Sequence, residues 1–572
     1  MARPPSEPDY AWSRPGGLVE FSGAEPGSLD IWVYCDKFSY NQGGSVSLRT
    51  YSAAPAYDIE IFKDGCEPRS VFHKKGLPGH QHETPSDAYA VGCNWPEALS
   101  IRLDEETWTP GYYVVIIRAR DRHQRVRERE GFFIVKAENP SDADFVLIHT
   151  TCTVLAYNDW GGANHYRGLP DGYQNDTLTP LSSTQRPIAR GMIRIPDNAP
   201  REGTGDFMPG LNWTPRYLSL EYSWYGRYSR HYADAGYAIY ERPFILWAES
   251  AGYQIHHLTQ TDLQDSAASP LDGYPCAVIV GHDEYWTWEQ RDTIDQFVDQ
   301  GGSFARFGGD FAKQVRLSSD LKTQYYYGTP DQDPESKTDP RRTTTSWEWP
   351  DIQRPAAQTV GLCGLTGVYA RYGVATPRSS GGFLVYRPDH WALRGTQLFY
   401  GDTFGGNPVN IAAFEVDGCQ YTFRQGLPYP TFEDGVPSTL EIIAMCPAVL
   451  GEQDRWNGSE PIGGPVRDKI ELMQSLFKPE KDGSTNMPKY LKGLKYGSGM
   501  IASFTRQKGE VFCAGTAEWV VGLKKRDPYT EIITKNVLNK FIGKPVRRLG
   551  CRLWHHTYQL NILAKSLHVG VR

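Results

Sequence analysis

Three ionisable side chains, His282, Asp283 and Glu284, follow one another directly after a short apolar run, 276–281. A continuous apolar run of this length is typical of a strand buried on both faces of a parallel sheet. The three side chains then lie at the carboxyl end of the strand, where open α/β sheets bind their ligands. A histidine and two carboxylates at a buried turn lower stability unless they have partners or hold a metal. The sequence therefore predicts a functional site at this turn.

Two other predicted strands lead into residues of similar chemistry. The strand 144–149 runs towards the segment 156–162, which contains Tyr157, and the strand 303–307 is followed by Asp310 after two glycines. Because the carboxyl ends of parallel strands meet at one edge of a sheet, we expect these residues to face one crevice. Phenolate and carboxylate oxygens are hard donors that suit a hard, highly charged metal ion. Such an ion polarises a carbonyl or lowers the pKa of bound water.

The elements that must position these residues are also visible in the sequence. Thr287 and Gln290 have the spacing of a capping box, and Gly301 supplies a stop, so a helix is expected between them. A second strand is expected at 253–258, after a helical stripe that ends at Gly252. Strands that alternate with helices predict βαβ units and a parallel sheet.

The remainder of the chain divides by pattern. About seven short strands with period-two alternation predict a β-sandwich at 30–140, ahead of an α/β catalytic domain at 144–545. The overall class is therefore α+β and multidomain. Four further segments lack a clear period: an irregular lead-in, two inserted loops and a basic tail, at 1–29, 179–215, 328–353 and 546–572.

Composition excludes several classes of protein. A chain of 572 residues is too long for one core, so two or three domains are expected. The net charge of −7 argues against a nucleic-acid-binding role. The ten cysteines are scattered singly without a CxxC pair, which favours a reducing compartment. With neither an apolar leader nor an apolar run long enough to span a bilayer, a cytoplasmic protein without membrane contact is expected.

Seven short motifs occur in a fixed order along the chain. They are Tyr157-Asn158-Asp159-Trp160-Gly161-Gly162, Gly281-His282-Asp283-Glu284-Tyr285-Trp286, Phe307-Gly308-Gly309, Gln314-Val315-Arg316, Asp389-His390-Trp391, Phe414-Glu415-Val416-Asp417 and Ala514-Gly515-Thr516. In number and order they resemble the large (beta) subunit family of N,N-dimethylformamidase, and the resemblance runs from about residue 30 to residue 545. It implies a β-sandwich followed by a glutamine-amidotransferase-like α/β domain with a mostly parallel sheet. It also implies one mononuclear iron, as Fe(III), held by two tyrosinates and one glutamate without a histidine ligand.

The resemblance assigns the metal ligands residue by residue. Glu284 matches the glutamate ligand, Tyr157 matches the tyrosine of the first motif, and Tyr232 matches the second tyrosine. The family has Arg-Pro-Tyr at that last position, whereas this chain has Arg-His-Tyr at 230–232, so Tyr228 is the second candidate. Binding of the ion would depress the pKa values of the tyrosine ligands.

The same resemblance supplies three catalytic candidates. His282 matches a histidine beside the metal, and Glu415 matches a glutamate proposed as general base. Asp310 stands where the family usually has asparagine, and this exchange of an amide for a carboxylate leaves the substrate open. Cys152 is tempting as an amidotransferase nucleophile, but the turn that would carry one holds His282 instead, so Cys152 is read as buried and inert.

Each residue alone also has a structural explanation. Tyr157 alone would more often be a packing residue, Glu284 could favour the following helix through its dipole, and Asp310 could cap a helix. Their convergence on one crevice favours function: an iron-dependent hydrolase of a small amide, with a glutamate base. The alternatives are cyclisation or deamidation of a larger metabolite on the same iron site, and a non-catalytic binding protein. The resemblance further implies that the chain binds a small subunit. Association of the chain with further copies of itself is also expected as an option.

Overall fold

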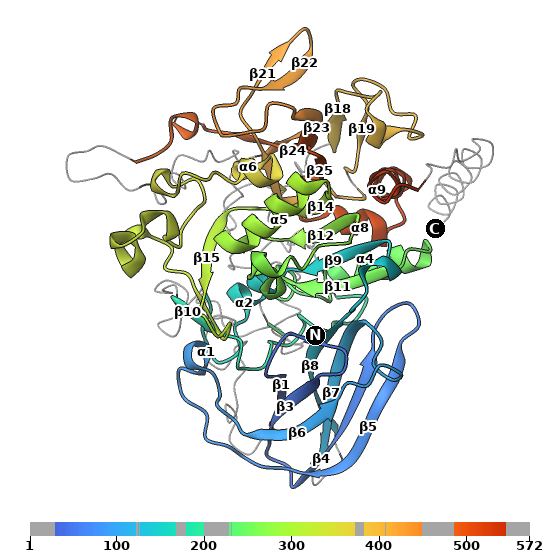
Figure 1. Ribbon diagram of the computed structural model, residues 1–572, viewed down its shortest axis with the longest axis vertical. Coiled ribbons are helices and arrows are strands. Elements are labelled where there is room, and N and C mark those ends of the chain that lie inside the picture. Colours follow the sequence, from blue (N-terminus) through green and yellow to red (C-terminus); the bar gives the residue numbers. More distant parts are fainter. Residues whose placement is uncertain are drawn as a thin grey trace, which may run out of the picture.

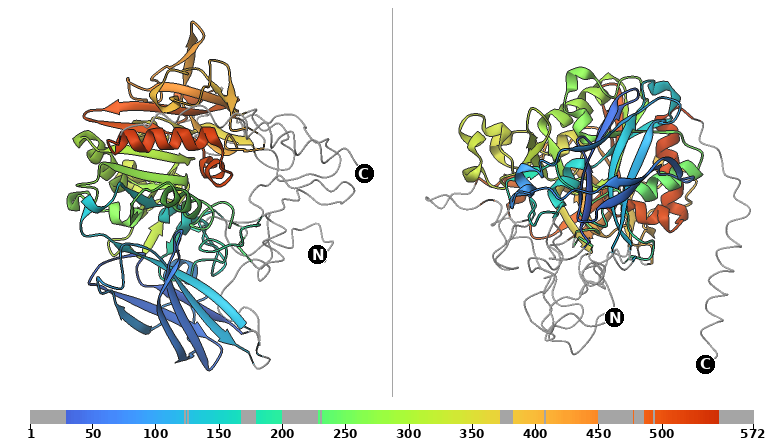
Figure 2. Two further views of the ribbon diagram at one scale, coloured as in Figure 1. Left: turned by 90° about the vertical axis from the view of Figure 1, so that its right-hand side faces the viewer. Right: turned by 90° about the horizontal axis from the view of Figure 1, so that it is seen from below.

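The structure is a computed structural model, and its shape is shown in Figures 1 and 2. It describes residues 29–121, 124, 126–166, 179–199, 228–229, 231–371, 382–406, 408–448, 477, 486–492 and 494–544. The expected basic tail, nearly all of the expected lead-in and residues 200–215 of the first expected loop lie outside this part of the chain. Within it, no helix combines the length and the apolar character needed to cross a membrane.

Two facing sheets, antiparallel apart from one parallel strand pair, form the N-terminal part of the molecule, the lower end in Figure 1. Their inward residues, such as Val33, Ile59 and Val115, share one buried core. The strand 56–63 alternates buried and outward side chains, whereas residues 111–117 are buried on both faces because their other face packs against the rest of the molecule. Among the described residues, one sheet has three strands in the order β1 (Ile31–Cys35), β3 (Ser45–Ser52), β6 (Glu97–Arg102). The other has β2 (Ser39–Asn41), β8 (Val126–Lys136), β7 (Gly111–Arg120), β4 (Ala56–Lys63), β5 (Arg69–Pro78), with β2 joined to β8 in parallel.

A large mixed sheet forms the centre of the molecule. In the described part of the chain its order is β11 (Ile255–Thr259), β9 (Phe145–His149), β12 (Cys276–His282), β14 (Ser303–Gly309), β25 (Gly509–Cys513), β24 (Gly497–Arg506), β23 (Glu441–Ala448), β18 (Phe383–Val385), β19 (Thr403–Phe404). The first five strands are parallel, and the other four follow antiparallel. The expectation of a mostly parallel sheet therefore holds for only half of it. The short turn between β24 and β25 permits antiparallel pairing of these two strands, and the remaining strands on that side continue the antiparallel order.

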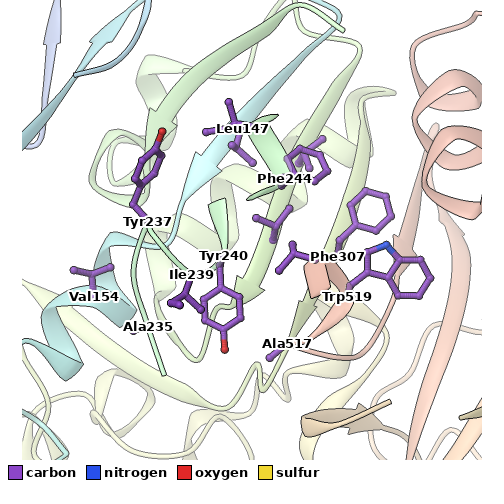
Figure 3. Packing of buried hydrophobic residues seen from close by; sticks show 14 of the residues in the cluster. Leu147, Val154, Ala235, Tyr237, Ile239, Tyr240, Phe244, Phe307, Ala517 and Trp519 are labelled. Carbon is purple, nitrogen blue, oxygen red and sulfur yellow. The ribbon is translucent and has the colours of Figure 1, made fainter. Parts of the chain in front are cut away.

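Helices cover both faces of the parallel half. On one face lie α4 (Glu241–Ser250), α8 (Trp519–Lys524) and α9 (Pro528–Phe541), where Phe244 and Trp519 pack with Phe307 of β14 (Figure 3). On the other lies α5 (Trp288–Gln300), the crossover from β12 to β14. The predicted limits of α5 are confirmed, because Thr287 and Gln290 form the capping box and Gly301 is left-handed.

The described residues contain several smaller elements. They are α1 (Ala88–Val91), α2 (Thr151–Tyr157) and α6 (Ala357–Val360), and a sheet of β10 (Leu181–Ser183), β16 (Thr323–Tyr325), β15 (Lys313–Leu317) and β13 (Tyr285–Thr287). A further pair is β17 (Cys363–Arg371) with β20 (Phe414–Gly418), and β21 (Tyr421–Arg424) with β22 (Leu427–Pro430) makes the hairpin that projects at the top of Figure 1. The second expected loop, 328–353, consists of connections with short 3-10 turns.

The N-terminal sheets pack directly on the segment that leads into α4. Tyr112 of β7 stacks on Tyr237, with ring centroids 3.6 Å apart. Asp64, at the end of β4, accepts hydrogen bonds from the Tyr237 hydroxyl at 3.0 Å and from Nε of Arg242 at 2.7 Å. A buried carboxylate is tolerated here because a guanidinium and a phenol satisfy it.

Candidate metal centre and active site

The site begins where β12 ends. Gly281 has φ 80°, and a Cβ added there would lie 2.2 Å from Cγ of Tyr240. Only glycine allows this approach and this left-handed backbone. The bend turns the last residue of β12, His282, and the following Glu284 towards the carboxyl edge of the sheet, where both side chains are buried. His282 and Glu284 therefore lie where the sequence predicts them, at the carboxyl end of a buried strand.

His282 is held at both ring nitrogens. Its Nδ1 lies 2.8 Å from the backbone oxygen of Asp234 and donates to it. Its Nε2 lies 2.5 Å from Oε2 of Glu415, 3.6 Å from Oδ2 of Asp310 and 3.7 Å from Oε2 of Glu284. Three carboxylates, two of them on other strands or turns, thus converge on one imidazole nitrogen.

One proton must lie between His282 and Glu415. With Nδ1–H committed to the Asp234 carbonyl, a neutral ring would direct its Nε2 lone pair at an ionised carboxylate, which is repulsive. Burial alone would lower the His282 pKa, but the charge of Glu415 and the nearby carboxylates outweigh it and raise that pKa well above its usual range. Burial raises the pKa of Glu415 to about 8, although His282 opposes the shift. The pair is therefore built to hold and release one proton.

Tyr157 and Glu284 make a second pair beside the first. The phenol of Tyr157 donates to Oε2 of Glu284 at 2.9 Å. Burial, and then the Glu284 charge, raise the pKa of Tyr157 well above its usual range, while burial and Asp310 raise the pKa of Glu284 to about 7. A tyrosinate would form here only beside a strong positive charge, which a metal ion supplies. The sequence predicted that Tyr157 follows a strand directly. It lies instead in the last turn of α2, the seven-residue helix that comes after β9.

Asp310 follows β14 in a left-handed conformation, φ 63°. Its backbone N–H donates to Oδ1 of Asp417 at 2.6 Å, and its carboxylate lies over the backbone of Gly364, where an added Cβ would be 2.2 Å from Oδ1. A non-glycine residue in this conformation is strained, and such strain persists where surrounding contacts fix it. The turn thereby directs the Asp310 carboxylate towards His282.

β20 carries Glu415 across the end of β14. Ala517 N donates to the backbone oxygen of Glu415 at 3.0 Å, and Asp417 N donates to Gly515 O at 2.9 Å. A Cβ at Gly309 would lie 2.7 Å from the Glu415 oxygen, so glycine is needed for this close approach. Glu415 is thus fixed beside His282 by backbone contacts with β14 and with the residues that follow β25.

A buried ion cluster holds the two turns that carry the site residues, and the sequence did not predict it. Arg306 of β14 donates to both carboxylate oxygens of Asp283, at 2.6 and 2.8 Å, and to Oδ2 of Asp417 at 2.5 Å. All three side chains are fully buried. Since Asp417 also binds the Asp310 backbone, this cluster fixes the turns on either side of His282. The one sequence feature that could have indicated this cluster is the arginine within the otherwise apolar strand 303–309.

Two more residues of the site, Asp234 and Lys313, were not predicted from the sequence. Asp234 supplies the carbonyl that orients His282. Lys313 is half-buried; burial would lower its pKa, but Tyr326 and the Glu284 and Asp310 charges hold it above its usual value. Neither residue stands in a recognisable motif, because each acts across the fold.

The second tyrosine position lies on the segment before α4. Tyr232 is fully buried, and its ring centroid lies 6.3 Å from that of Tyr228. The ring of Tyr228 in turn lies under the Arg190 guanidinium. The adjacent His231 packs edge-on against Tyr157 at 5.3 Å, which brings this segment to the site. The choice between Tyr232 and Tyr228 as ligand stays a prediction.

The donors present fit a metal ion. The ligand atoms of His282, Glu284 and Asp310 all lie within 4.8 Å of one another. Glu284 and Asp310 form, with Tyr157, a set of hard oxygen donors, whereas both nitrogens of His282 are already engaged by Asp234 and Glu415. This set shares Glu284 and Tyr157 with the ligands implied by the resemblance. Iron itself stays a prediction.

Cys152 lies away from this chemistry. Its sulfur is buried, with Nε2 of Gln290 at 3.4 Å, and burial raises the pKa of the thiol to about 12. A thiol of that pKa is not a nucleophile at neutral pH.

Comparison with known proteins gives three findings. No curated protein matches the chain. Among the solved structures that match part of the chain are Spo0M from Bacillus subtilis (12% identity, 20% of this chain and 51% of that chain, TM-score 0.15), murine CRIg (11%, 18% and 96%, 0.13) and superoxide reductase from Ignicoccus hospitalis (10%, 21% and 98%, 0.13). The chain thus spans about half of Spo0M, and the amidotransferase-like assignment stays a prediction.

A family model described as "N,N-dimethylformamidase beta subunit-like, C-terminal" matches residues 58–531. These residues include every part of the site built above, and the chain belongs to this family.

Proposed function

We propose that the chain is a metal-dependent hydrolase that cleaves the C–N bond of a small amide. The single observation that carries this is the proton-sharing pair of His282 and Glu415 beside the oxygen donors of Tyr157 and Glu284, in a member of the dimethylformamidase beta subunit-like family. Amide hydrolysis needs an electrophile, a proton acceptor and a proton donor for the leaving amine. The site offers a group for each role.

The metal in this proposal is mononuclear iron, as Fe(III), held by Tyr157, Glu284 and Tyr232, with Tyr228 as the second option. When bound, it would polarise the amide carbonyl or lower the pKa of a water. The burial of Tyr157 beside Glu284 supports this ligand set, because an ionised phenol and a carboxylate buried together need a compensating cation.

The chain's own residues move the proton. Glu415 takes a proton from water, and His282, oriented through Nδ1 by Asp234, shares it at Nε2 and passes it to the leaving amine. Asp310, 3.6 Å from Nε2, stabilises the charged form of the ring. Arg306 and its carboxylates keep both turns in place.

The test combines metal analysis of the purified protein with a panel of small amides. We expect stoichiometric iron, a visible tyrosinate charge-transfer band, and hydrolysis of at least one amide. Glu284→Ala should lose the metal and the band while the circular dichroism spectrum is kept. Full iron occupancy in Glu284→Ala would overturn the ligand assignment. A colourless, iron-replete ferric protein would rule out tyrosinate.

The same experiment separates the alternatives. A non-catalytic binding protein should purify without stoichiometric metal, whereas cyclisation or deamidation of a larger metabolite would leave iron present and the small amides uncleaved. The family description names a beta subunit, so we also propose a multi-subunit enzyme, to be tested by the mass of the native complex.

A further inference from the structure

A small cavity lies where β8, α2 and the start of α4 meet. It offers about 20 Å³ of space to a water-sized body. Much of its wall is apolar, from side chains such as Phe132 and Val154. Three polar side chains also line it, His149, Thr151 and Glu241, and at most 3% of each residue is exposed. Polar groups this deeply buried need hydrogen-bond partners.

Each of these three side chains has one buried atom that lacks a partner within the described part of the chain. The atoms are Nδ1 of His149, Oγ1 of Thr151 and Oε2 of Glu241. The other carboxylate oxygen of Glu241 accepts from N and Oγ1 of Thr150, at 3.0 and 2.8 Å. Nε2 of His149 lies 3.0 Å from Nδ1 of His257. Because native proteins rarely leave buried polar atoms unpaired, three of them around one small cavity indicate a shared partner.

A water molecule fits this position in size and in chemistry. One water needs roughly 10–15 Å³ of such space and typically makes about three hydrogen bonds. Water both donates and accepts, so it pairs with a carboxylate, a hydroxyl and either tautomer of an imidazole. A metal ion would need about four or more ligand atoms, whereas the cavity supplies three.

We propose that this cavity is a binding site for one permanent internal water, which joins the starts of α2 and α4. Glu241, the first residue of α4, holds Thr150 directly with one carboxylate oxygen. The water extends the contact of the other oxygen to Thr151, the first residue of α2, and to His149 at the end of β9. Three elements are thereby tied together at one point.

The joint bears on the proposed centre without belonging to it. The helix α2 ends at Tyr157, and α4 follows the segment that contains Tyr232. A water that fixes the starts of both helices therefore helps to hold the two elements that carry the proposed tyrosine ligands. The water site itself does not depend on the proposed reaction.

A high-resolution crystal structure of the full chain is the first test. We expect electron density in the cavity at about 2.7–3.2 Å from Nδ1 of His149, Oγ1 of Thr151 and Oε2 of Glu241. A cavity without density would overturn the inference. So would contacts of about 2.0–2.4 Å, because these are the distances of a bound metal ion.

Thr151→Val tests the same site in solution. Valine keeps the shape of threonine and nearly its helix propensity, and it removes only the hydroxyl. With the water bound, the change breaks one of its hydrogen bonds, so Tm should fall. In a dry cavity a methyl group would replace an unpaired hydroxyl, and Tm would stay the same or rise. That result would contradict the proposal.

Val154→Ile supplies the matched background, because its additional methyl group takes the space of the water. Once the water is displaced, Thr151→Val should no longer lower Tm. Overpacking by isoleucine alone would leave the cost of Thr151→Val unchanged, so equal losses in the two backgrounds would also count against the water. Circular dichroism establishes that each variant is folded. If Val154→Ile does not fold, the single variant Thr151→Val and the crystal structure decide.

Discussion

At the scale of single residues, the chemistry depends on the proton between Glu415 and His282. Their facing atoms are 2.5 Å apart, and Nδ1 of the ring is already committed to a carbonyl. Because the contact is buried, water does not compete for the proton. The two residues therefore act as one proton-holding unit, so a change at either should alter proton transfer more than metal binding.

Glu415→Gln is the direct test of this unit. The amide keeps the shape of the side chain but cannot take a proton, so kcat should fall on the order of a hundredfold or more. Iron content should be unchanged, because Glu415 is not among the proposed ligands. The measurement is kcat beside iron stoichiometry, with exposed Glu433→Gln as a control that should match the wild type. A near-normal kcat in Glu415→Gln would remove the base assignment.

Arg306 is the residue on which the geometry of the site depends. Arg306→Leu leaves Asp283 and Asp417 as unpaired carboxylates in a dry interior. Removing one partner of a buried ion cluster costs about 3–5 kcal/mol of unfolding free energy. Urea unfolding measures this loss, and Arg341→Leu, which breaks the exposed pair with Asp339, should cost less than about 1 kcal/mol. Equal effects for the two arginine variants would contradict the buried role.

At the scale of elements, β9 and β11 carry a histidine pair of their own. His149 Nε2 and His257 Nδ1 lie 3.0 Å apart, both buried. Burial lowers the pKa of His149 to about 3 and that of His257 well below its usual value. Both rings are therefore neutral when folded, and each takes up a proton near pH 6.5 when unfolded.

This pair predicts a pH dependence of stability. Between the unfolded and folded pKa values the unfolded chain binds more protons, so the free energy of unfolding must fall as the pH drops below about 6.5. The slope is at most about 1.4 kcal/mol per pH unit for each histidine, and it persists down to about pH 3 for His149. Urea unfolding between pH 7 and pH 5 should show a smaller slope in the double variant His149→Asn, His257→Asn. An unchanged slope would place the acid sensitivity elsewhere.

The elements that the sequence predicts are those with local signals. The helix α5 follows from the capping box at Thr287 and the glycine at 301, because both act within one turn of the helix. The helix α2 is missed, since its Thr-rich start after a strand has no strong helical period. Motif order identifies Glu415 and Glu284 as candidates. The support from Asp234 and Arg306 depends on contacts between distant segments, which no local pattern encodes.

At the scale of the whole molecule, the N-terminal sheets and the central sheet share one hydrophobic core, in which Tyr112 and Ile134 belong to the same buried cluster as Leu147, and polar contacts also join the two parts. Asp64 binds Tyr237 and Arg242, and Asp262 of the segment after β11 accepts from Ser39 and Lys136. Tyr237 belongs to the same segment as Asp234 and His231, so this interface also fixes the residues that orient the site.

Asp64→Asn tests that interface. Loss of the charge weakens two hydrogen bonds and leaves Arg242 without its carboxylate, a cost of about 1–3 kcal/mol in unfolding free energy. Glu60→Gln is the matched control on the same strand, where the pair with Arg118 is half-exposed and worth under about 1 kcal/mol. Differential scanning calorimetry should show a lower Tm for Asp64→Asn alone. Equal Tm values for the two variants would mean that the interface does not depend on Asp64.

The pairing of β14 with β25 has a consequence for how the chain is made. Arg306 and Cys513, joined across these strands, are 207 residues apart in the sequence. During synthesis, β14 leaves the ribosome long before its neighbour exists, and its open edge can pair with other chains. The N-terminal sheets have all their partners by residue 136 and are complete early. The site, whose turns β25 closes, can mature only when nearly the whole polypeptide has been released.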